Sequence, residues 1–212
     1  MTKFLIGLRI LVLAYMAWLI VFLMTDYGTP QGRVHMPFVL VVTDWINLFI
    51  HEGGHGIFRI FGEFIYMLGG SLMQLILPGA AVIVFLRSGM GTLPFTLFWL
   101  GENIVNVSVY MSDAPYRRLP LISKYATHDW GYITDTLGVT HLAEDFGLAV
   151  KILGILTCLG GLGVGIFIVI QRVREEFFPA PERPLPPLRR PIRAASHREQ
   201  GHLPPDGGNR IL

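Results

Sequence analysis

The chain has 212 residues, of which 52% are hydrophobic and 15% are charged. Ordinary globular domains carry about 25% charged residues, so this composition excludes a typical water-soluble protein. The formal net charge of +2 comes largely from the C-terminal tail, and no segment interleaves basic and aromatic residues as nucleic-acid binders do. We therefore expect an all-α, polytopic integral membrane protein that contacts lipid and binds no nucleic acid.

Five segments are apolar over about 20 residues, the length that a helix needs to cross the hydrocarbon core of a bilayer. They are residues 4–24, 36–61, 65–86, 93–111 and 148–170. The first is too long for a signal peptide and lacks a small-residue cleavage site after Met24, so we expect a retained span. The prediction is about five transmembrane helices in one domain, residues 1–172.

The remaining segment, residues 173–212, has a different composition. It contains a proline-rich run at 179–191, many arginines and few large apolar residues. Such a segment cannot bury enough apolar surface to fold by itself, so we expect a disordered tail. The positive-inside rule places this tail in the cytoplasm.

The second apolar segment contains an HExxH motif, His51-Glu52-Gly53-Gly54-His55. Histidines four residues apart lie on one face of a helix, where both imidazoles can bind a single Zn²⁺, and the glutamate can act as a base toward water. Ionisable groups are costly at membrane depth and mark function there. The motif predicts His51 and His55 as zinc ligands and Glu52 as a catalytic base; a polar cluster that only stabilises helix packing is the alternative.

The order of the spans indicates which residues lie near this motif. Successive spans alternate in direction, so the end of the second, the start of the third and the end of the fourth share one side of the membrane. Polar side chains occur in these regions and in the second span itself, where they can orient a histidine ligand or line a pocket. These candidates are Asp44, Asn47, Gln74, Asn103, Asn106 and Tyr110.

A catalytic zinc site normally has three protein ligands and one position open to water. We prefer His128 as the third ligand, because imidazole suits zinc and the loop after the fourth span lies on the correct side. Asp113 fits by depth, since it continues a polar stripe on the fourth span. Asp129 fits by its chemistry. Both aspartates remain alternatives at this point.

Residues 47–62, with HEGGH in a predicted transmembrane helix, resemble the site-2 protease family of intramembrane zinc metalloproteases. The resemblance implies that His51 and His55 bind zinc, that Glu52 is the base and that the substrate is a membrane-embedded peptide. The third ligand in that family is an aspartate of an Asp-Gly motif within a later span. The Asp-Gly pair of this chain, Asp206-Gly207, lies in the tail instead.

Two functions are consistent with these patterns. The first is a zinc-dependent intramembrane metallopeptidase, a hydrolase that cleaves a transmembrane peptide or protein. The alternative is a non-catalytic membrane scaffold or metal-handling protein that retains the zinc-binding cluster. An iron-dependent hydroxylase or desaturase would need several histidine boxes, and outside the motif only His128 and His141 lie near the membrane domain on a plausible side.

Overall fold

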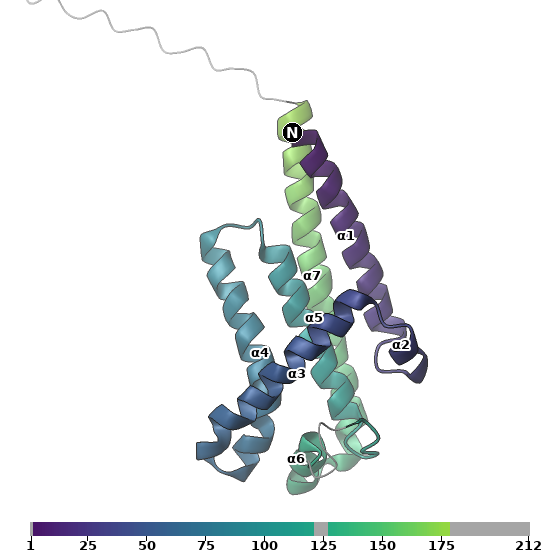
Figure 1. Ribbon diagram of the computed structural model, residues 1–212, viewed down its shortest axis with the longest axis vertical. Coiled ribbons are helices and arrows are strands. Elements are labelled where there is room, and N and C mark those ends of the chain that lie inside the picture. The colour runs from purple at the N-terminus through teal and green to yellow at the C-terminus, as the bar shows by residue number, and fades with distance from the viewer. Residues whose placement is uncertain (1, 121–126, 179–212) are drawn as a thin grey trace, which may run out of the picture. The chain divides into compact units, whose positions relative to one another are not determined.

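Every regular element of the computed structural model is a helix within the described residues, 2–120 and 127–178 (Figure 1). The long helices are α1 (Thr2–Thr25), α3 (Phe38–Phe58), α4 (Glu63–Ser88), α5 (Leu93–Ser112) and α7 (Ala143–Phe177). The short ones are α2 (Pro30–Val34), α6 (Asp129–Leu137) and the 3-10 turns η1 (Arg59–Phe61) and η2 (Thr140–Leu142). The all-α prediction is confirmed. Helix α7 runs past the predicted domain boundary at residue 172, and the rest of the predicted tail, from residue 179, lies outside the described residues.

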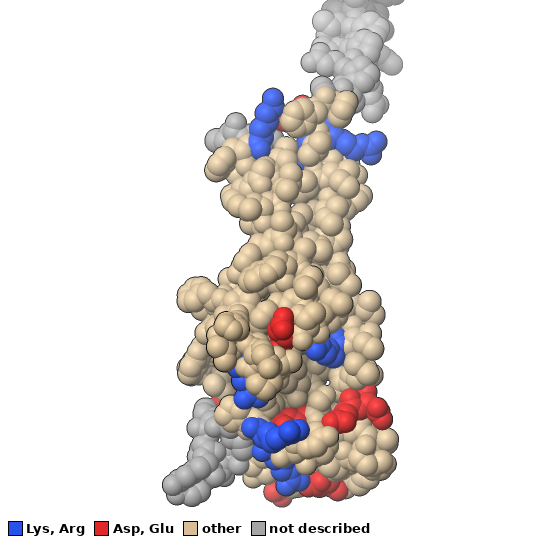
Figure 2. Space-filling view, turned by 90° about the vertical axis from the view of Figure 1, so that its right-hand side faces the viewer, with Lys and Arg blue, Asp and Glu red and all other residues tan. Residues whose placement is uncertain are grey.

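Three helical stretches of the described chain are long and apolar enough to cross a membrane: Lys3–Thr25, Glu63–Ser88 and Thr140–Phe177. The prediction of about five membrane helices is therefore supported for three of the five segments. The other two predicted spans, 36–61 and 93–111, do form α3 and α5, but His, Glu, Asp and Asn side chains make these helices less apolar. On the face in Figure 2, charged side chains gather in the lower half and at the upper end, and the band between them carries no Lys, Arg, Asp or Glu.

A glycine turn places the end of α3 beside the start of α4. After α3 the chain tightens into η1 and reaches Gly62, whose φ of +92° lies in a region that favours glycine. The two helices approach so closely after this turn that a Cβ on Gly54 of α3 would lie 2.3 Å from the carbonyl oxygen of Gly69 in α4. Residues at the C-terminal end of α3 are thereby held against the first turns of α4.

Helix α5 lies between α4 and α7, and its contact with α7 depends on glycine. A Cβ on Gly101 would lie 2.6 Å from the carbonyl oxygen of Gly154, and a Cβ on Gly154 would lie 2.8 Å from that of Gly101. Such small residues allow helix backbones to approach closely in membranes. Buried side chains from four helices pack around this contact and form the core: Leu19, Leu23, Leu40, Val105, Ile155 and Cys158.

Helix α3 crosses the bundle obliquely, whereas α1 and α7 run side by side (Figure 1). Its first turn places Leu40 in the core with Leu23 of α1. Its last turns lie against α4 through the Gly54 contact. One helix therefore links the end of α1 to the start of α4, and the HExxH motif lies at its far end.

The glycine contact between α5 and α7 predicts different effects of two Gly→Ala substitutions in the same helix. Gly154→Ala should lower the free energy of unfolding by about 1–3 kcal/mol, because its Cβ overlaps backbone atoms of α5 that cannot move independently. Gly160→Ala should not destabilise the protein, because no atom lies within 4 Å of its Cβ position and alanine favours a helix over glycine. Unfolding of both variants in detergent micelles checks this, and equal stabilities would contradict it.

Candidate metal centre

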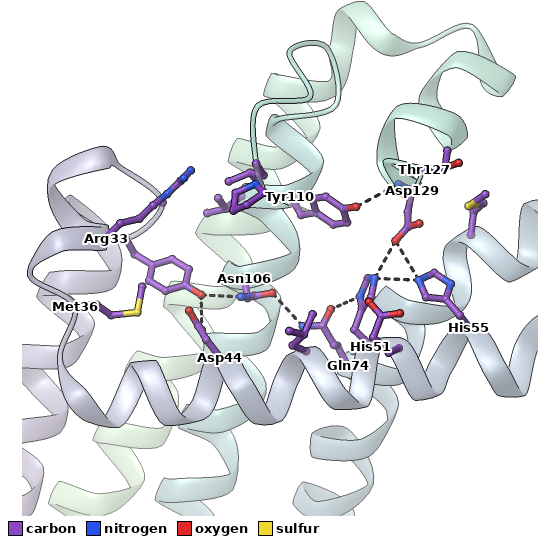
Figure 3. Close-up of a pocket in the computed structure, with 18 of the residues that line it drawn as sticks. Arg33, Met36, Asp44, His51, His55, Gln74, Asn106, Tyr110, Thr127 and Asp129 are labelled. Carbon is purple, nitrogen blue, oxygen red and sulfur yellow. Dashed lines mark hydrogen bonds and ion pairs between the residues drawn. The ribbon is translucent and has the colours of Figure 1, made fainter. Parts of the chain in front are cut away.

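Two histidines of α3 and one aspartate of α6 bring three potential ligand atoms together (Figure 3). His51 Nε2 lies 2.9 Å from Asp129 Oδ2, and His55 Nε2 lies 3.2 Å from the same oxygen. The two Nε2 atoms are 3.1 Å apart. Exposed fractions of 8% for His51, 9% for His55 and 5% for Asp129 show that the group is buried.

The other nitrogen of each histidine contacts an oxygen atom. His55 Nδ1 lies 2.7 Å from the backbone carbonyl oxygen of Tyr66, which only accepts hydrogen bonds, so Nδ1 carries the proton of the neutral ring. His51 Nδ1 lies 2.8 Å from Gln74 Oε1, which requires the same tautomer. Both Nε2 atoms then present lone pairs toward Asp129, the arrangement that metal-binding histidines adopt when their second nitrogen is hydrogen-bonded.

The three facing atoms of this group suit a metal ion. Each of them, two imidazole nitrogens and one carboxylate oxygen, has a lone pair and accepts hydrogen bonds. Burying three such atoms side by side is unfavourable unless a cation lies among them. Atoms bound to tetrahedral zinc at about 2.0–2.2 Å lie about 3.3–3.6 Å from one another, slightly farther apart than the 2.9–3.2 Å found here. His51, His55 and Asp129 can therefore hold a metal ion.

Helix α6 supplies the third member of the group, and His128 holds its first turn. His128 Nδ1 accepts a hydrogen bond from the backbone N–H of Gly131 at 3.0 Å, which caps the helix. His128 Nε2 donates to Asp113 Oδ2 at 3.3 Å. Burial lowers the pKa of His128, although the Asp113 carboxylate opposes this effect. His128, the third ligand preferred from the sequence, thus lies outside the group with Asp113, and the structure places the alternative, Asp129, in it.

Two further hydrogen bonds attach α6 to the long helices. Trp130 Nε1 donates to Ser71 Oγ of α4 at 3.0 Å. The backbone N–H of Asp129 donates to the hydroxyl of Tyr110 in α5 at 3.3 Å. The Asp129 carboxylate is therefore positioned by contacts with α4 and α5 as well as by its own helix cap.

A cavity of about 560 Å³ adjoins the three ligand atoms. His51, Glu52, His55 and Asp129 line one side of it, and Arg33 and Met36 lie on the opposite side (Figure 3). Glu52 is half-buried and lines the cavity together with His51 and His55. The cavity gives space next to the metal-binding group.

The other residues predicted for the site fall into two sets. Asp44, Gln74, Asn106 and Tyr110 line the cavity. Asn47 and Asn103 are fully buried and do not line it; Asn47 Nδ2 donates to Glu102 Oε2 at 2.8 Å, and Asn103 Nδ2 donates to the Trp99 carbonyl oxygen at 2.9 Å. Asn47 therefore joins α3 to α5, whereas the hydrogen bond of Asn103 stays within α5.

Sequence reasoning missed three contributors to the site: Tyr27, Arg33 and Tyr66. Tyr27 and Arg33 follow the first span, a region that the alternation of spans places on the opposite side from the motif. Tyr66 contributes a backbone carbonyl, which no side-chain pattern can indicate. The signal that could have drawn attention to Tyr27 is its position among polar residues immediately after an apolar span.

The described residues define an all-helical protein with three helices that could cross a membrane and a buried His-His-Asp group that can hold a metal. No protein-family model, no curated protein and no solved structure matches the chain. The resemblance of residues 47–62 to the site-2 proteases therefore rests on the motif alone.

The geometry predicts which substitutions remove bound metal. Protein purified without a histidine tag should contain stoichiometric metal, and His55→Ala and Asp129→Ala should each lose it because each removes a ligand. His141→Ala and Asp145→Ala are matched controls at exposed positions and should retain it. Elemental analysis by mass spectrometry measures the content. Metal loss in His128→Ala together with full retention in Asp129→Ala would contradict the assignment.

Proposed function

We propose that the protein is a zinc-dependent intramembrane metallopeptidase that cleaves a peptide bond in or near the membrane. The observation that carries the proposal is the common location of Glu52 and the His51, His55 and Asp129 group on one cavity. His51, His55 and Asp129 would hold the zinc. Bound there, zinc would polarise the scissile carbonyl and lower the pKa of a water molecule.

Glu52 is the residue of this chain suited to move the protons. It follows His51 directly in α3 and reaches the cavity beside both histidines. A carboxylate in this position can take a proton from the attacking water and deliver it to the leaving amine. His51, His55 and Asp129 cannot accept this proton while their lone pairs bind the metal. Glu52 is therefore the residue proposed as the base.

The shape of the cavity supports a peptide as substrate. It extends along α3 from Asp44 to His55, a helical stretch about 16 Å long at 1.5 Å per residue. An extended peptide of about five residues has the same length. A purely structural zinc site is closed by four protein ligands, whereas this group has three and adjoins a cavity, which favours catalysis over a scaffold.

We propose in addition that α3 and α5 lie within the bilayer with the three more apolar helices, giving a multi-pass protein with about five membrane helices. Large apolar side chains on α3 face outward, including Phe38, Trp45, Phe49 and Ile57, whose exposed fractions run from 56% to 79%. Lipid is the environment in which such a surface is stable. Helix α5, packed between α4 and α7, would then be shielded from lipid over much of its length.

This placement predicts the reactivity of two introduced cysteines toward a water-soluble maleimide. Phe49→Cys should be unreactive in liposomes, because a thiol in lipid does not ionise. Gln31→Cys in α2, also exposed, should react. The native Cys158 is fully buried and provides the background, and both variants should react after denaturation. Rapid labelling of Phe49→Cys in intact liposomes would contradict a membrane location for α3.

The proposed role of Glu52 separates catalysis from metal binding. Glu52→Gln should lower peptide hydrolysis by about 10²–10⁴-fold, because the amide cannot accept the proton. The metal content should stay unchanged, because Glu52 is not one of the three proposed ligands. Glu63→Gln, exposed in the first turn of α4, should be fully active. Cleavage of a library of membrane-spanning peptides in liposomes, detected by mass spectrometry, measures this. Identical cleavage by wild type and Glu52→Gln would reject the peptidase, and metal binding without cleavage would favour a metal-handling role.

A further inference from the structure

A line of hydrogen bonds leads from the metal-binding group to a carboxylate at the other end of the cavity (Figure 3). His51 Nδ1 lies 2.8 Å from Gln74 Oε1, and Gln74 Nε2 lies 3.0 Å from Asn106 Oδ1. Asn106 Nδ2 lies 2.7 Å from the Tyr27 hydroxyl, which lies 2.7 Å from Asp44 Oδ1. Tyr27 at 5% exposed and Gln74 at 3% are buried, and Asn106 and Asp44 are half-buried.

We infer that Asp44 determines, through Tyr27, Asn106 and Gln74, which nitrogen of His51 carries the proton and which has a lone pair free to bind the metal. The inference rests on the proposed metal site and assigns positioning roles to residues that do not touch the metal. Metal-binding histidines need their second nitrogen held by a partner, and such partners affect metal affinity by about 10–100-fold. Here the partner of His51 is a side-chain amide whose own orientation must be fixed.

The direction of each hydrogen bond in the line, from donor to acceptor, follows from the Asp44 carboxylate at its end. The Tyr27 hydroxyl has one proton and donates it to Asp44 Oδ1, so its lone pair accepts from Asn106 Nδ2. The nitrogen of Asn106 then faces Tyr27, and its oxygen faces Gln74. A single acceptor at Asp44 thus orients the first amide.

The same logic continues to the histidine. Because the oxygen of Asn106 faces Gln74, the nitrogen of Gln74 must face Asn106, and its oxygen must face His51. This oxygen accepts the proton on His51 Nδ1, which leaves the Nε2 lone pair directed at Asp129 and the metal. Without the acceptor at Asp44, both amides can turn over, and the reversed Gln74 would offer a donor to Nδ1.

His55 provides a comparison within the same site. Its Nδ1 contacts the backbone carbonyl oxygen of Tyr66, which cannot turn over. The two ligands therefore differ: the tautomer of His55 is set by the backbone of α4, and that of His51 by side chains from α3, α4, α5 and the segment after α1. The line is a positioning device and not a proton path, because the amide side chains of Gln74 and Asn106 are neither acidic nor basic enough near neutral pH to relay a proton.

Tyr27→Phe tests the inference, because it removes only the hydroxyl that joins Asn106 to Asp44. We expect zinc affinity, measured by chelator competition, to fall about 10-fold. The ¹⁵N NMR shifts of His51 in metal-free protein should show the Nδ1–H tautomer in the wild type and a mixture in the variant, while those of His55 stay unchanged. Tyr116→Phe, which removes a hydrogen bond to the exposed Glu144, is the matched control and should alter neither.

A second pair of variants covers the case in which Tyr27→Phe fails to fold. Asp44→Asn keeps an acceptor oxygen for Tyr27 and should retain most of the zinc affinity and the His51 tautomer, whereas Asp44→Leu should lose both. Equal behaviour of these two variants, or an unchanged His51 tautomer in Tyr27→Phe, would overturn the inference. A wild type that binds no zinc would instead refute the proposed function, and the tautomer measurement would still show whether Asp44 controls His51.

Discussion

Three atoms that accept hydrogen bonds meet within 3.2 Å of one another in the interior of this protein, and the rest of the site depends on that meeting. Like partial charges repel more strongly when they are buried, since little water screens them. Such a convergence needs both a cation to neutralise it and a rigid frame to hold the ligands together before the cation arrives. The hydrogen bonds to Tyr66, Gln74 and Tyr110 are parts of this frame.

The helical bundle provides the frame through one oblique helix and several close backbone contacts. Helix α3 carries His51, Glu52 and His55. Because it crosses the bundle obliquely, it reaches from the end of α1 to the start of α4 (Figure 1). Glycines hold the neighbouring helices near: Gly54 against α4, and Gly101 and Gly154 between α5 and α7. Helix α5 is thereby fixed in the bundle, and it presents Asn106 and Tyr110 to the cavity.

The sequence predicted the helices well because long apolar runs and a spacing of four residues between histidines are local patterns. It also placed Gln74, Asn106 and Tyr110 near the motif, since alternating spans match residues by depth. The alternation argument assumes parallel spans, however, and the oblique course of α3 brings Tyr27 to Asp44, which that argument could not foresee. The sequence could not decide between His128 and Asp129 as the third ligand, because they are adjacent residues. Adjacent residues at a helix start point in different directions, and only the cap formed by His128 reveals which one faces the histidines.

The ligand from α6 has a consequence for the order of events during synthesis. His51 and Asp129 are separated by 78 positions in the chain, and α4 and α5 lie between them. A growing chain therefore contains the histidine pair well before Asp129 is made. The complete His-His-Asp group can form only after the intervening helices have folded and α6 has docked on them. A metal site built in this way is completed late in synthesis, because the residue that closes it is made after most of the helices that hold it.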